Sequence, residues 1–166
     1  MTQKASKTAK SKGGDDEIQR VVAENRRARH EYEVLESLEC GLALRGTEVK
    51  SLRHGKVSLD ESYARVDGGE VWLVNCDIPE YRQGGMWNHE PKRLRKLLMH
   101  RLEVLKFAAK SKEKGLTLVP LRLYFTQRGI AKLLLGLCRG KQLHDKRESI
   151  KTRETKREID RQLRRR

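Results

Sequence analysis

The sequence has few aromatic residues and no long hydrophobic run. Aromatic side chains make up only 5% of the 166 residues, which disfavours a sheet that binds RNA by stacking many rings on bases. The longest apolar run, residues 133–138, is far too short to cross a bilayer. The first fourteen residues lack the apolar segment of a signal peptide. We therefore expect a cytoplasmic protein without a membrane-spanning helix.

Cysteine and histidine are too scattered for a disulfide framework or a metal site. The three cysteines, Cys40, Cys76 and Cys138, are odd in number and show no C-x-x-C spacing. The five histidines share no metal-ligand spacing, and we expect them at the surface or facing RNA. The sequence therefore predicts reduced cysteines in a cytosolic core, with no metal and no cofactor.

Two stretches begin like catalytic or nucleotide-binding motifs but lack the residues that the chemistry needs. Residues 89–90 start like a zincin motif, but Arg93 stands at the fifth position and Pro91 breaks the required helix. Residues 136–141 resemble a Walker loop that is one residue short and is followed by Gln142 instead of Ser or Thr. No G-x-S-x-G motif occurs either, so we expect no enzymatic activity.

Positive charge is what the chain has in excess. Its 38 Lys and Arg residues against 23 Asp and Glu residues give a net charge of +15. Such a surplus indicates a polyanionic partner, nucleic acid first and an anionic membrane surface second. The membrane role is disfavoured, because no expected helix combines a strongly apolar face with a basic one.

Much of this charge lies at the two ends of the chain. Residues 1–24 are rich in Lys, Ser and Thr and are expected to form a disordered basic arm. Residues 140–166 contain eleven Lys or Arg, five acids and only four aliphatic residues, too few to fold alone. Acids three or four residues before bases favour a helix slightly. We expect a tail that is disordered alone and helical on a polyanion; the alternative is a basic solubilising tail.

The middle of the chain, residues 25–139, shows short strand patterns interrupted by helices. Strand patterns occupy residues 31–38, 62–66, 71–75, 116–125 and 130–138. Residues 62–75 predict a hairpin, and Pro120 predicts a sheet edge or a bulge. We expect a small antiparallel β-barrel, because closure hides the strand edges.

Two helices and one loop are expected between these strands. Residues 48–53 predict a short helix that is capped by Thr47 and ended at Gly55, with basic residues on its outer side. Leucine spacing predicts one helix over residues 92–113. Residues 83–91 are expected to form a flexible loop.

Four ordered stretches resemble the SsrA-binding protein (SmpB) family. They are residues 25–32, residues 41–55, residues 95–98 with 114–121, and residues 140–147. The resemblance covers roughly residues 24–151 and implies an oligonucleotide-binding-type barrel of about six antiparallel strands with three helices. It also implies a strand at residues 95–99 and a helix that starts near His100 or Arg101, against the single helix above.

The resemblance implies a role in bacterial trans-translation without catalysis. Proteins of this family bind the tRNA-like end of tmRNA and bring it to stalled ribosomes. The implied partners are tmRNA and the small-subunit decoding centre of the ribosome, with elongation factor Tu and alanyl-tRNA synthetase reached indirectly through tmRNA. The expected state is a monomer in complex with tmRNA. A structural ribosomal protein is the alternative, and a nuclease would need metal-binding carboxylates that no motif supplies.

The family's RNA-binding positions map onto Glu39, Leu98 and Lys132. Lys132 suits a phosphate contact. Glu39 suits a base amino group or a 2′-hydroxyl, or it orients a nearby cation such as Arg45. Leu98 suits an unstacked base, or it is an ordinary core leucine. The other candidates for RNA contact are the basic residues Arg27, Arg29, His30, Lys50, Arg139 and Lys141.

The resemblance assigns the C-terminal tail to the ribosome. The tail positions that match the family are His144, Asp145, Lys146, Arg147, Ile150 and Lys151. His144 would stack in the decoding centre, and residues 145–147 would serve tagging more than tmRNA binding. Ile150 and Lys151 would begin a segment that folds as a helix in the mRNA channel. Gln142 stands where the family commonly has a lysine.

Overall fold

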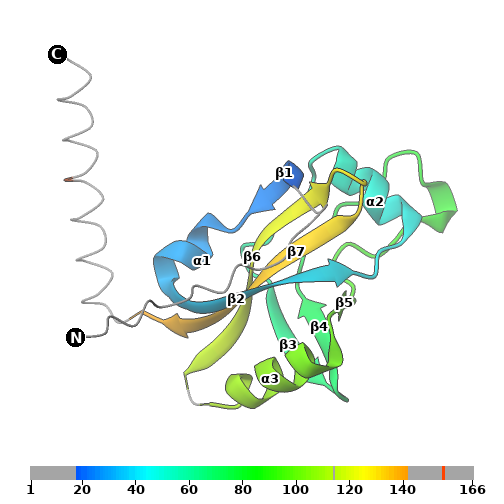
Figure 1. Cartoon of the computed structure of the whole chain (residues 1–166). Coiled ribbons are helices and arrows are strands. Elements are labelled where there is room, and N and C mark those ends of the chain that lie inside the picture. The colour runs from blue at the N-terminus through cyan, green and yellow to red at the C-terminus, as the bar shows by residue number, and fades with distance from the viewer. Residues whose placement is uncertain (1–17, 114, 142–154, 156–166) are drawn as a thin grey trace, which may run out of the picture.

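The computed structural model describes residues 18–113, 115–141 and 155 as a strand-rich fold with short helices (Figure 1). The strands are β1 (Ile18–Glu24), β2 (Tyr32–Leu42), β3 (Tyr63–Asp67), β4 (Glu70–Val74), β5 (Arg95–Leu98), β6 (Leu116–Thr126) and β7 (Ala131–Gly140). The helices are α1 (Arg26–Glu31), α2 (Gly46–Arg53) and α3 (Arg101–Ser111), with a 3-10 turn η1 (Gly85–Trp87).

Six of the strands close into a ring. The order β6-β3-β4-β5-β2-β7 returns to its start because β7 also pairs with β6, and every pairing is antiparallel. β1 lies outside this ring and pairs with the second half of β6. The prediction of a barrel with about six antiparallel strands and three helices is confirmed.

Alternate residues of the strands fill the inside of the barrel. On β4, Val71 and Leu73 are fully buried while their neighbours are half-buried, as the two-residue period of a strand requires. β6 is buried along most of its length, because part of its outer face is covered as well. There Ala28 of α1 packs with Val119 and Leu121. α1 therefore lies against the outside of the barrel, at the start of β2.

The hairpin and the bulge predicted from local patterns are confirmed. β3 and β4 are joined through Gly68 and Gly69, whose φ angles are 57° and 77°. A two-residue hairpin turn of this kind needs positive φ at both positions, which glycine adopts without strain. The register between β6 and β7 shifts between Pro120 and Arg122. The bulge accommodates a proline, which has no N–H to donate.

The single helix predicted over residues 92–113 is wrong, and the division implied by the family resemblance is confirmed. β5 covers Arg95–Leu98, and α3 begins only at Arg101. The leucine spacing misled because it did not mark a buried face: only Leu97 is buried, while Leu98, Leu102 and Leu105 are exposed. α3 contacts the core through Val104 and Phe107 instead. β5 pairs with β4 and β2, which satisfies its backbone in the sheet. The carboxylate of Glu103 accepts a hydrogen bond from the His100 N–H at 3.0 Å and so closes the first turn of α3.

The helix predicted from Thr47 onward exists, but its cap is different. α2 begins at Gly46, and the Glu48 carboxylate accepts from the Arg45 N–H at 2.6 Å. The prediction of Thr47 as the cap is wrong, because its hydroxyl is used elsewhere, 2.9 Å from His89 Nδ1. Gly55 follows the helix with a φ of 72°, as expected for a C-terminal glycine.

The N-terminal arm is shorter than predicted. Residues 18–24 form β1 instead of continuing a disordered arm, because the second half of β6 offers an open edge and Val22 packs against the core. At the other end, β7 runs to Gly140, and the Lys141 N–H donates to Glu31 O at 2.9 Å. The folded unit thus extends beyond residues 25–139 on both sides. Residues 1–17 lie outside the described residues.

The three cysteines are buried and unpaired. Burial raises the pKa of the Cys40 thiol to about 12, and those of Cys76 and Cys138 to about 11. They are protonated near neutral pH and act as small apolar side chains. In the described part of the chain, no helix has the length and apolar character needed to cross a bilayer.

Candidate nucleic-acid interface

The candidate RNA-binding residues lie at the two ends of the ribbon formed by β2 and β7. Tyr32 pairs with Gly140 at one end, and Gly41 pairs with Lys132 at the other. These two pairs are about 30 Å apart at roughly 3.3 Å per strand residue. Figure 1 shows β2 running from α1 at one end to the neighbourhood of α2 at the other. We call these the tail end and the α2 end.

Gly41 is the central point of the α2 end. It pairs with Leu98 on β5 and with Lys132 on β7, and Glu39 precedes it on the same face of β2. Cys40, between them, is buried, so Glu39 and Gly41 face outward. The three residues that the family resemblance singles out therefore come together from three strands on the outer surface of the barrel.

Lys132 and Glu39 form an ion pair at the α2 end. Lys132 Nζ lies 2.5 Å from Glu39 Oε1, and the Tyr124 hydroxyl donates to the other carboxylate oxygen. The side chain of Lys132 is only 17% exposed and that of Glu39 is 40% exposed. The cation that Glu39 orients is thus Lys132, and the prediction of Arg45 is wrong. A surface pair like this contributes at most about 1 kcal/mol to stability, so its main effect is to fix the ammonium group in place.

Leu98 is an exposed side chain, and the alternative of a core leucine is excluded. It is 51% exposed, while Leu97 beside it is buried. A Cβ built on Gly41 would lie 3.3 Å from the Leu98 Cβ, closer than most such contacts. The glycine therefore lets β5 and β2 approach beneath an outward-facing leucine, whose apolar surface is available to an unstacked base.

Lys50 also lies toward the α2 end, on the exposed side of α2. This helix follows β2 after residues 43–45. The Lys50 ammonium lies 5.3 Å from the centre of the Tyr81 ring, within the range of a cation–π contact. Lys50 is exposed, as predicted.

The tail end carries the remaining candidates, and α1 holds most of them in ion pairs or hydrogen bonds. Arg27 Nε lies 2.8 Å from Glu31, and Arg29 Nη2 lies 2.7 Å from Glu24. Lys141 Nζ donates to Arg29 O at 3.1 Å. The other two candidates at this end are His30, which is half-buried on α1, and Arg139, which is exposed on β7.

Glu24 is the counter-charge of the tail end. Its carboxylate accepts from Arg122 at 2.9 Å and is paired with Arg29. The hydrogen bond from Arg122 lowers the pKa of Glu24 below its ordinary value, against partial desolvation, and the charge of Arg29 lowers it further. Glu24 therefore links β1 to α1 and β6, and α1 in turn holds Lys141, where the tail begins. The tail candidates, residues 144–147, 150 and 151, lie outside the described residues.

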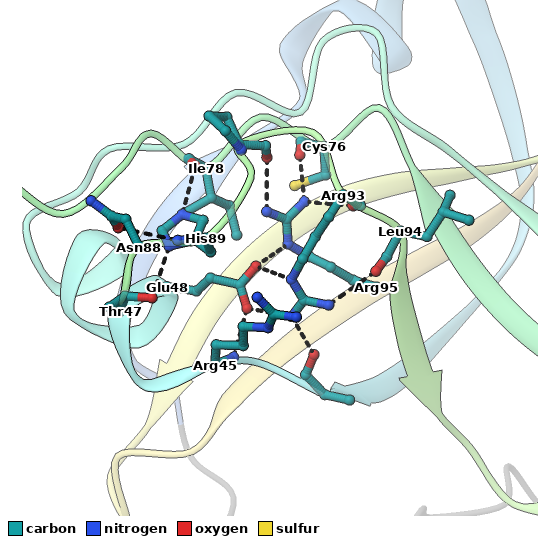
Figure 2. Close-up of polar contacts among 12 residues, drawn as sticks. Arg45, Thr47, Glu48, Cys76, Ile78, Asn88, His89, Arg93, Leu94 and Arg95 are labelled. Atoms are coloured by element: carbon teal, nitrogen blue, oxygen red, sulfur yellow. Dashed lines mark hydrogen bonds and ion pairs between the residues drawn. The ribbon is translucent and has the colours of Figure 1, made fainter. Parts of the chain in front are cut away.

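A buried ion network joins α2 to β5, and sequence reasoning did not find it. Figure 2 shows the side chains of Arg93 and Arg95 pointing toward Glu48 on α2. Glu48 and Arg95 are both fully buried. The Glu48 carboxylate accepts from Arg93 Nε and Arg95 Nε, each at 2.8 Å, and from the Arg45 N–H. Glu48 is 45 positions from Arg93 and 47 positions from Arg95 in the sequence, so no local pattern signals this network.

The buried charges of this network are matched by hydrogen bonds. The other donors of Arg95 reach the carbonyl oxygens of Cys76 at 2.6 Å and Pro91 at 2.8 Å. Burial alone would raise the pKa of Glu48, but hydrogen bonds from Arg93 and the Arg45 N–H, with the charge of Arg95, lower it overall. Glu48 therefore remains an anion that fastens α2 to the barrel.

His89 is a second buried link to α2, against the prediction that it lies at the surface. Its exposed fraction is 1%. His89 Nε2 donates to Ile78 O at 2.9 Å, because a carbonyl can only accept. The other ring nitrogen, Nδ1, is hydrogen-bonded to the Thr47 hydroxyl at 2.9 Å. The ring therefore joins the β4–β5 loop to α2 (Figure 2).

Nothing in this arrangement resembles a catalytic centre. Among residues 18–113 and 115–141, no group of His, Cys, Asp and Glu side chains could hold a metal ion. At the α2 end and the tail end, the carboxylates Glu39, Glu24 and Glu31 form ion pairs with Lys or Arg. What the surface offers is recognition of a ligand by charge and apolar contact.

Comparison with known proteins identifies the relatives of the chain. The family model described as "SmpB protein" matches residues 22–165. An "SsrA-binding protein" of Rhodopirellula baltica is 58% identical over 144 residues, which cover 87% of this chain and 82% of the relative. One from Pelotomaculum thermopropionicum is 57% identical over 147 residues, covering 89% of this chain and 95% of the relative. A solved structure described as "tmRNA-SmpB: a journey to the center of the bacterial ribosome" shares 52% identity with a TM-score of 0.64, covering 78% of this chain and 94% of that one.

Proposed function

Because the chain belongs to the SsrA-binding protein (SmpB) family, we propose that it binds the tRNA-like domain of tmRNA and brings this RNA to stalled ribosomes. The chain is a non-enzymatic RNA-binding protein. Its task is then recognition and delivery, and the ribosome and elongation factor Tu carry out the reactions that follow. A net charge of +15 suits a partner made of RNA.

The observation that carries this proposal is the meeting of Glu39, Leu98 and Lys132 around Gly41. These positions are far apart in the sequence and lie on three strands. The barrel brings an anion-binding group, an apolar side chain and a hydrogen-bond acceptor onto one outward face. RNA with unstacked bases offers a partner for each of them.

Each of the three residues has a distinct role in this proposal. Lys132 binds a phosphate, and Glu39 holds the ammonium group in position before RNA arrives. The free acceptor capacity of the Glu39 carboxylate suits a base amino group or a 2′-hydroxyl. Leu98 packs on the face of an unstacked base. Lys50 adds a phosphate contact from α2.

The C-terminal tail has a separate role, on the ribosome. It leaves the barrel after Lys141, at the end of the β2–β7 ribbon remote from Lys132. In a molecule that holds tmRNA at the α2 end, Lys141, where the tail begins, is therefore about 30 Å away along that ribbon. In this proposal His144 stacks in the vacant decoding site and residues 145–147 support tagging. Ile150 and Lys151 begin a helix in the mRNA channel. The cations of the tail end contact the RNA that lies nearest to the base of the tail.

The experiment is a binding titration with the tRNA-like domain of tmRNA at about physiological salt. It compares the full chain with a chain that ends at Lys141, which keeps the contacts between Lys141 and α1. An elongator tRNA at equal concentration is the competitor. Both chains are expected to bind with similar affinity and to resist competition. Loss of binding on truncation, or equal competition by the elongator tRNA, would show that affinity comes from generic charge.

A further inference from the structure

The loop between β4 and β5 exposes two large apolar side chains at its tip. Met86 is 97% exposed and Trp87 is 89% exposed. The tip is the turn η1, which projects beside α2 in Figure 1. Exposure of a whole indole is unfavourable in water, and aromatic side chains placed in this way commonly contact a ligand.

The base of this loop is held firmly, against the prediction of a flexible loop over residues 83–91. The Asn88 side chain accepts from the Tyr81 N–H at 3.1 Å and donates to Tyr81 O at 2.8 Å. A Cβ built on Gly84 would lie 2.9 Å from the Asn88 side chain, so the loop is closely packed there. His89 then anchors the end of the loop to α2. Trp87 therefore stands exposed on a positioned support.

Three cations lie near Tyr81, at the start of the same loop, without anionic partners. They are Lys50, Lys56 and Arg82, all exposed. Among the described residues, no carboxylate lies within 4 Å of any of these three. Many other cations of the barrel are in ion pairs, as at the tail end. Unpaired cations concentrated in one region attract a polyanion.

A shallow cleft with an aromatic wall lies between α2 and the start of the loop. His54 and Tyr81 stack with ring centres 6.0 Å apart and an angle of 18° between the rings. The cleft has a volume of about 370 Å³, and Glu80 is the one acidic residue among those that line it in the described chain. Flat rings and unpaired cations in one cleft match the chemistry of a nucleotide, which has a flat base and an anionic phosphate.

We propose that this α2–loop surface (Lys50, His54, Lys56, Tyr81, Arg82 and Trp87) is a second contact for the tRNA-like domain and binds nucleotides that are not base-paired. Trp87 stacks on one base, the His54–Tyr81 pair borders another, and the cations bind the adjoining phosphates. The inference rests on the proposed function. It extends the contact beyond Glu39, Leu98 and Lys132.

The position of the surface favours the tRNA-like RNA over the ribosome. α2 follows the end of β2 that carries Gly41, and the loop leads directly into β5, which carries Leu98. The surface is thus joined through short connections to the proposed tmRNA contacts. The tail, which the proposed function directs to the ribosome, leaves from the opposite end of the β2–β7 ribbon.

The test measures affinity for the tRNA-like domain with the full chain and four variants. Trp87→Ala is expected to weaken binding about tenfold, the effect of losing one stacked base, and Trp87→Phe to restore most of it. Trp72→Phe is the matched control, since Trp72 lies on β4 away from the loop tip.

The double variant Lys50→Gln with Lys56→Gln tests the cations. It is expected to weaken binding and to reduce the magnitude of the slope of log K against log[salt] by about one to two. In the Trp72→Phe chain, Trp87 is the one remaining tryptophan, and its fluorescence is expected to change on binding.

Each outcome has a defined meaning. The inference is overturned if Trp87→Ala binds the tRNA-like domain within twofold of the unchanged protein, or if Trp87 fluorescence does not respond. It is also overturned if Trp87→Ala loses affinity only for ribosomes or for anionic lipid vesicles. Lys132→Ala distinguishes failure of this inference from failure of the proposed function. If Lys132→Ala loses binding while the Trp87 variants bind like the unchanged protein, the proposed function is supported and the second contact is not.

Discussion

The tail end and the α2 end of the barrel are both basic, but they use their cations in different ways. At the tail end, Arg27 and Arg29 are held by Glu31 and Glu24, and Lys141 donates to a carbonyl of α1. At the α2 end, Lys132 is paired with Glu39, but Lys50 and the other cations of the α2–loop surface have no carboxylate partner among the described residues. A cation without a carboxylate partner can bind a phosphate without first breaking an ion pair. Charge counted along a sequence does not separate these two uses.

A buried ion network also supports the α2 end, whereas the ion pairs described at the tail end are all partly exposed. The Glu48 carboxylate and the Arg95 guanidinium are fully buried, and they fasten α2 to β5. Surface pairs such as Arg27–Glu31 are worth little in stability. Loss of one partner in a buried pair is costly, because an uncompensated charge remains in the core. The largest effects of substitution are therefore expected beneath the α2 end.

Replacement Glu48→Ala should remove the support of α2. The Arg95 charge would stay buried without its anion, which is expected to lower the free energy of unfolding by about 3–5 kcal/mol. Urea unfolding followed by circular dichroism measures the change. Arg27→Ala is the matched control, because it breaks an exposed pair and should cost less than about 1 kcal/mol. Equal losses in the two variants would contradict the comparison between the ends.

The same network predicts an acid-sensitive fold. The pKa of Glu48 is lowered in the folded protein from its ordinary value of 4.5. The carboxylate therefore stabilises the fold fully above the unfolded value, and this stabilisation is lost as pH falls through the lowered value. Glu48→Gln is expected to be less stable at pH 7 and to lose less stability between pH 5 and pH 3. A parallel pH dependence in both proteins would show that other groups control the acid transition.

Lys132→Ala should weaken binding of the tRNA-like domain about tenfold. One phosphate contact is lost, and Glu39 remains as an uncompensated anion beside the RNA. Arg29→Ala at the tail end is the matched variant, since it also removes a cation paired with a glutamate, and it should change affinity less than threefold. Filter binding or fluorescence anisotropy at several salt concentrations measures both. A larger loss for Arg29→Ala would reverse the proposed order of the two ends.

Gly41→Ala tests the close approach at the centre of the α2 end. The added methyl group would lie 3.3 Å from the Leu98 Cβ and should push this side chain by a few tenths of an ångström. We expect a loss of affinity of about threefold and a change in stability below about 1.5 kcal/mol. Gly46→Ala provides a control on α2, because nothing lies within 4 Å of a Cβ there. Unchanged affinity for Gly41→Ala would argue against a precise role for Leu98.

The smallest effect on RNA affinity is expected from the tail. The triple variant Asp145→Ala, Lys146→Ala and Arg147→Ala should bind the tRNA-like domain within about twofold of wild type, because these residues serve the ribosome in the proposed function. Tagging of a truncated reporter protein in a reconstituted translation reaction should be lost. If this variant fails to bind the RNA, the division between the α2 end and the tail is wrong.

Several features of the fold were predictable from short-range patterns. The hairpin at Gly68 and Gly69, the bulge at Pro120 and the end of α2 at Gly55 follow from the backbone preferences of single residues. The alternation in β4 follows from its period. The family resemblance supplied the boundary between β5 and α3, which periodicity missed because leucines on a strand and on the next helix were spaced as in one helix.

The contacts of the site were less predictable, because they join distant parts of the chain. Nothing local distinguishes His89, buried against Ile78 and Thr47, from a histidine at the surface. The sequence around Trp87 gave no signal of its exposure, because a loop pattern does not show which of its side chains are covered. Both positions are decided by how the β4–β5 loop packs on α2.

The sequence by itself determined the excess of positive charge, the antiparallel barrel and the family, because composition, period and motif spacing are properties of the chain alone. Only the tertiary structure decided which cations are neutralised. Lys132 meets Glu39 across two strands, and Arg95 meets Glu48 across 47 residues of sequence, while Lys50 meets no carboxylate among the described residues. The Coulomb energy of a charge depends on its distance to other charges and on its burial, and folding sets both.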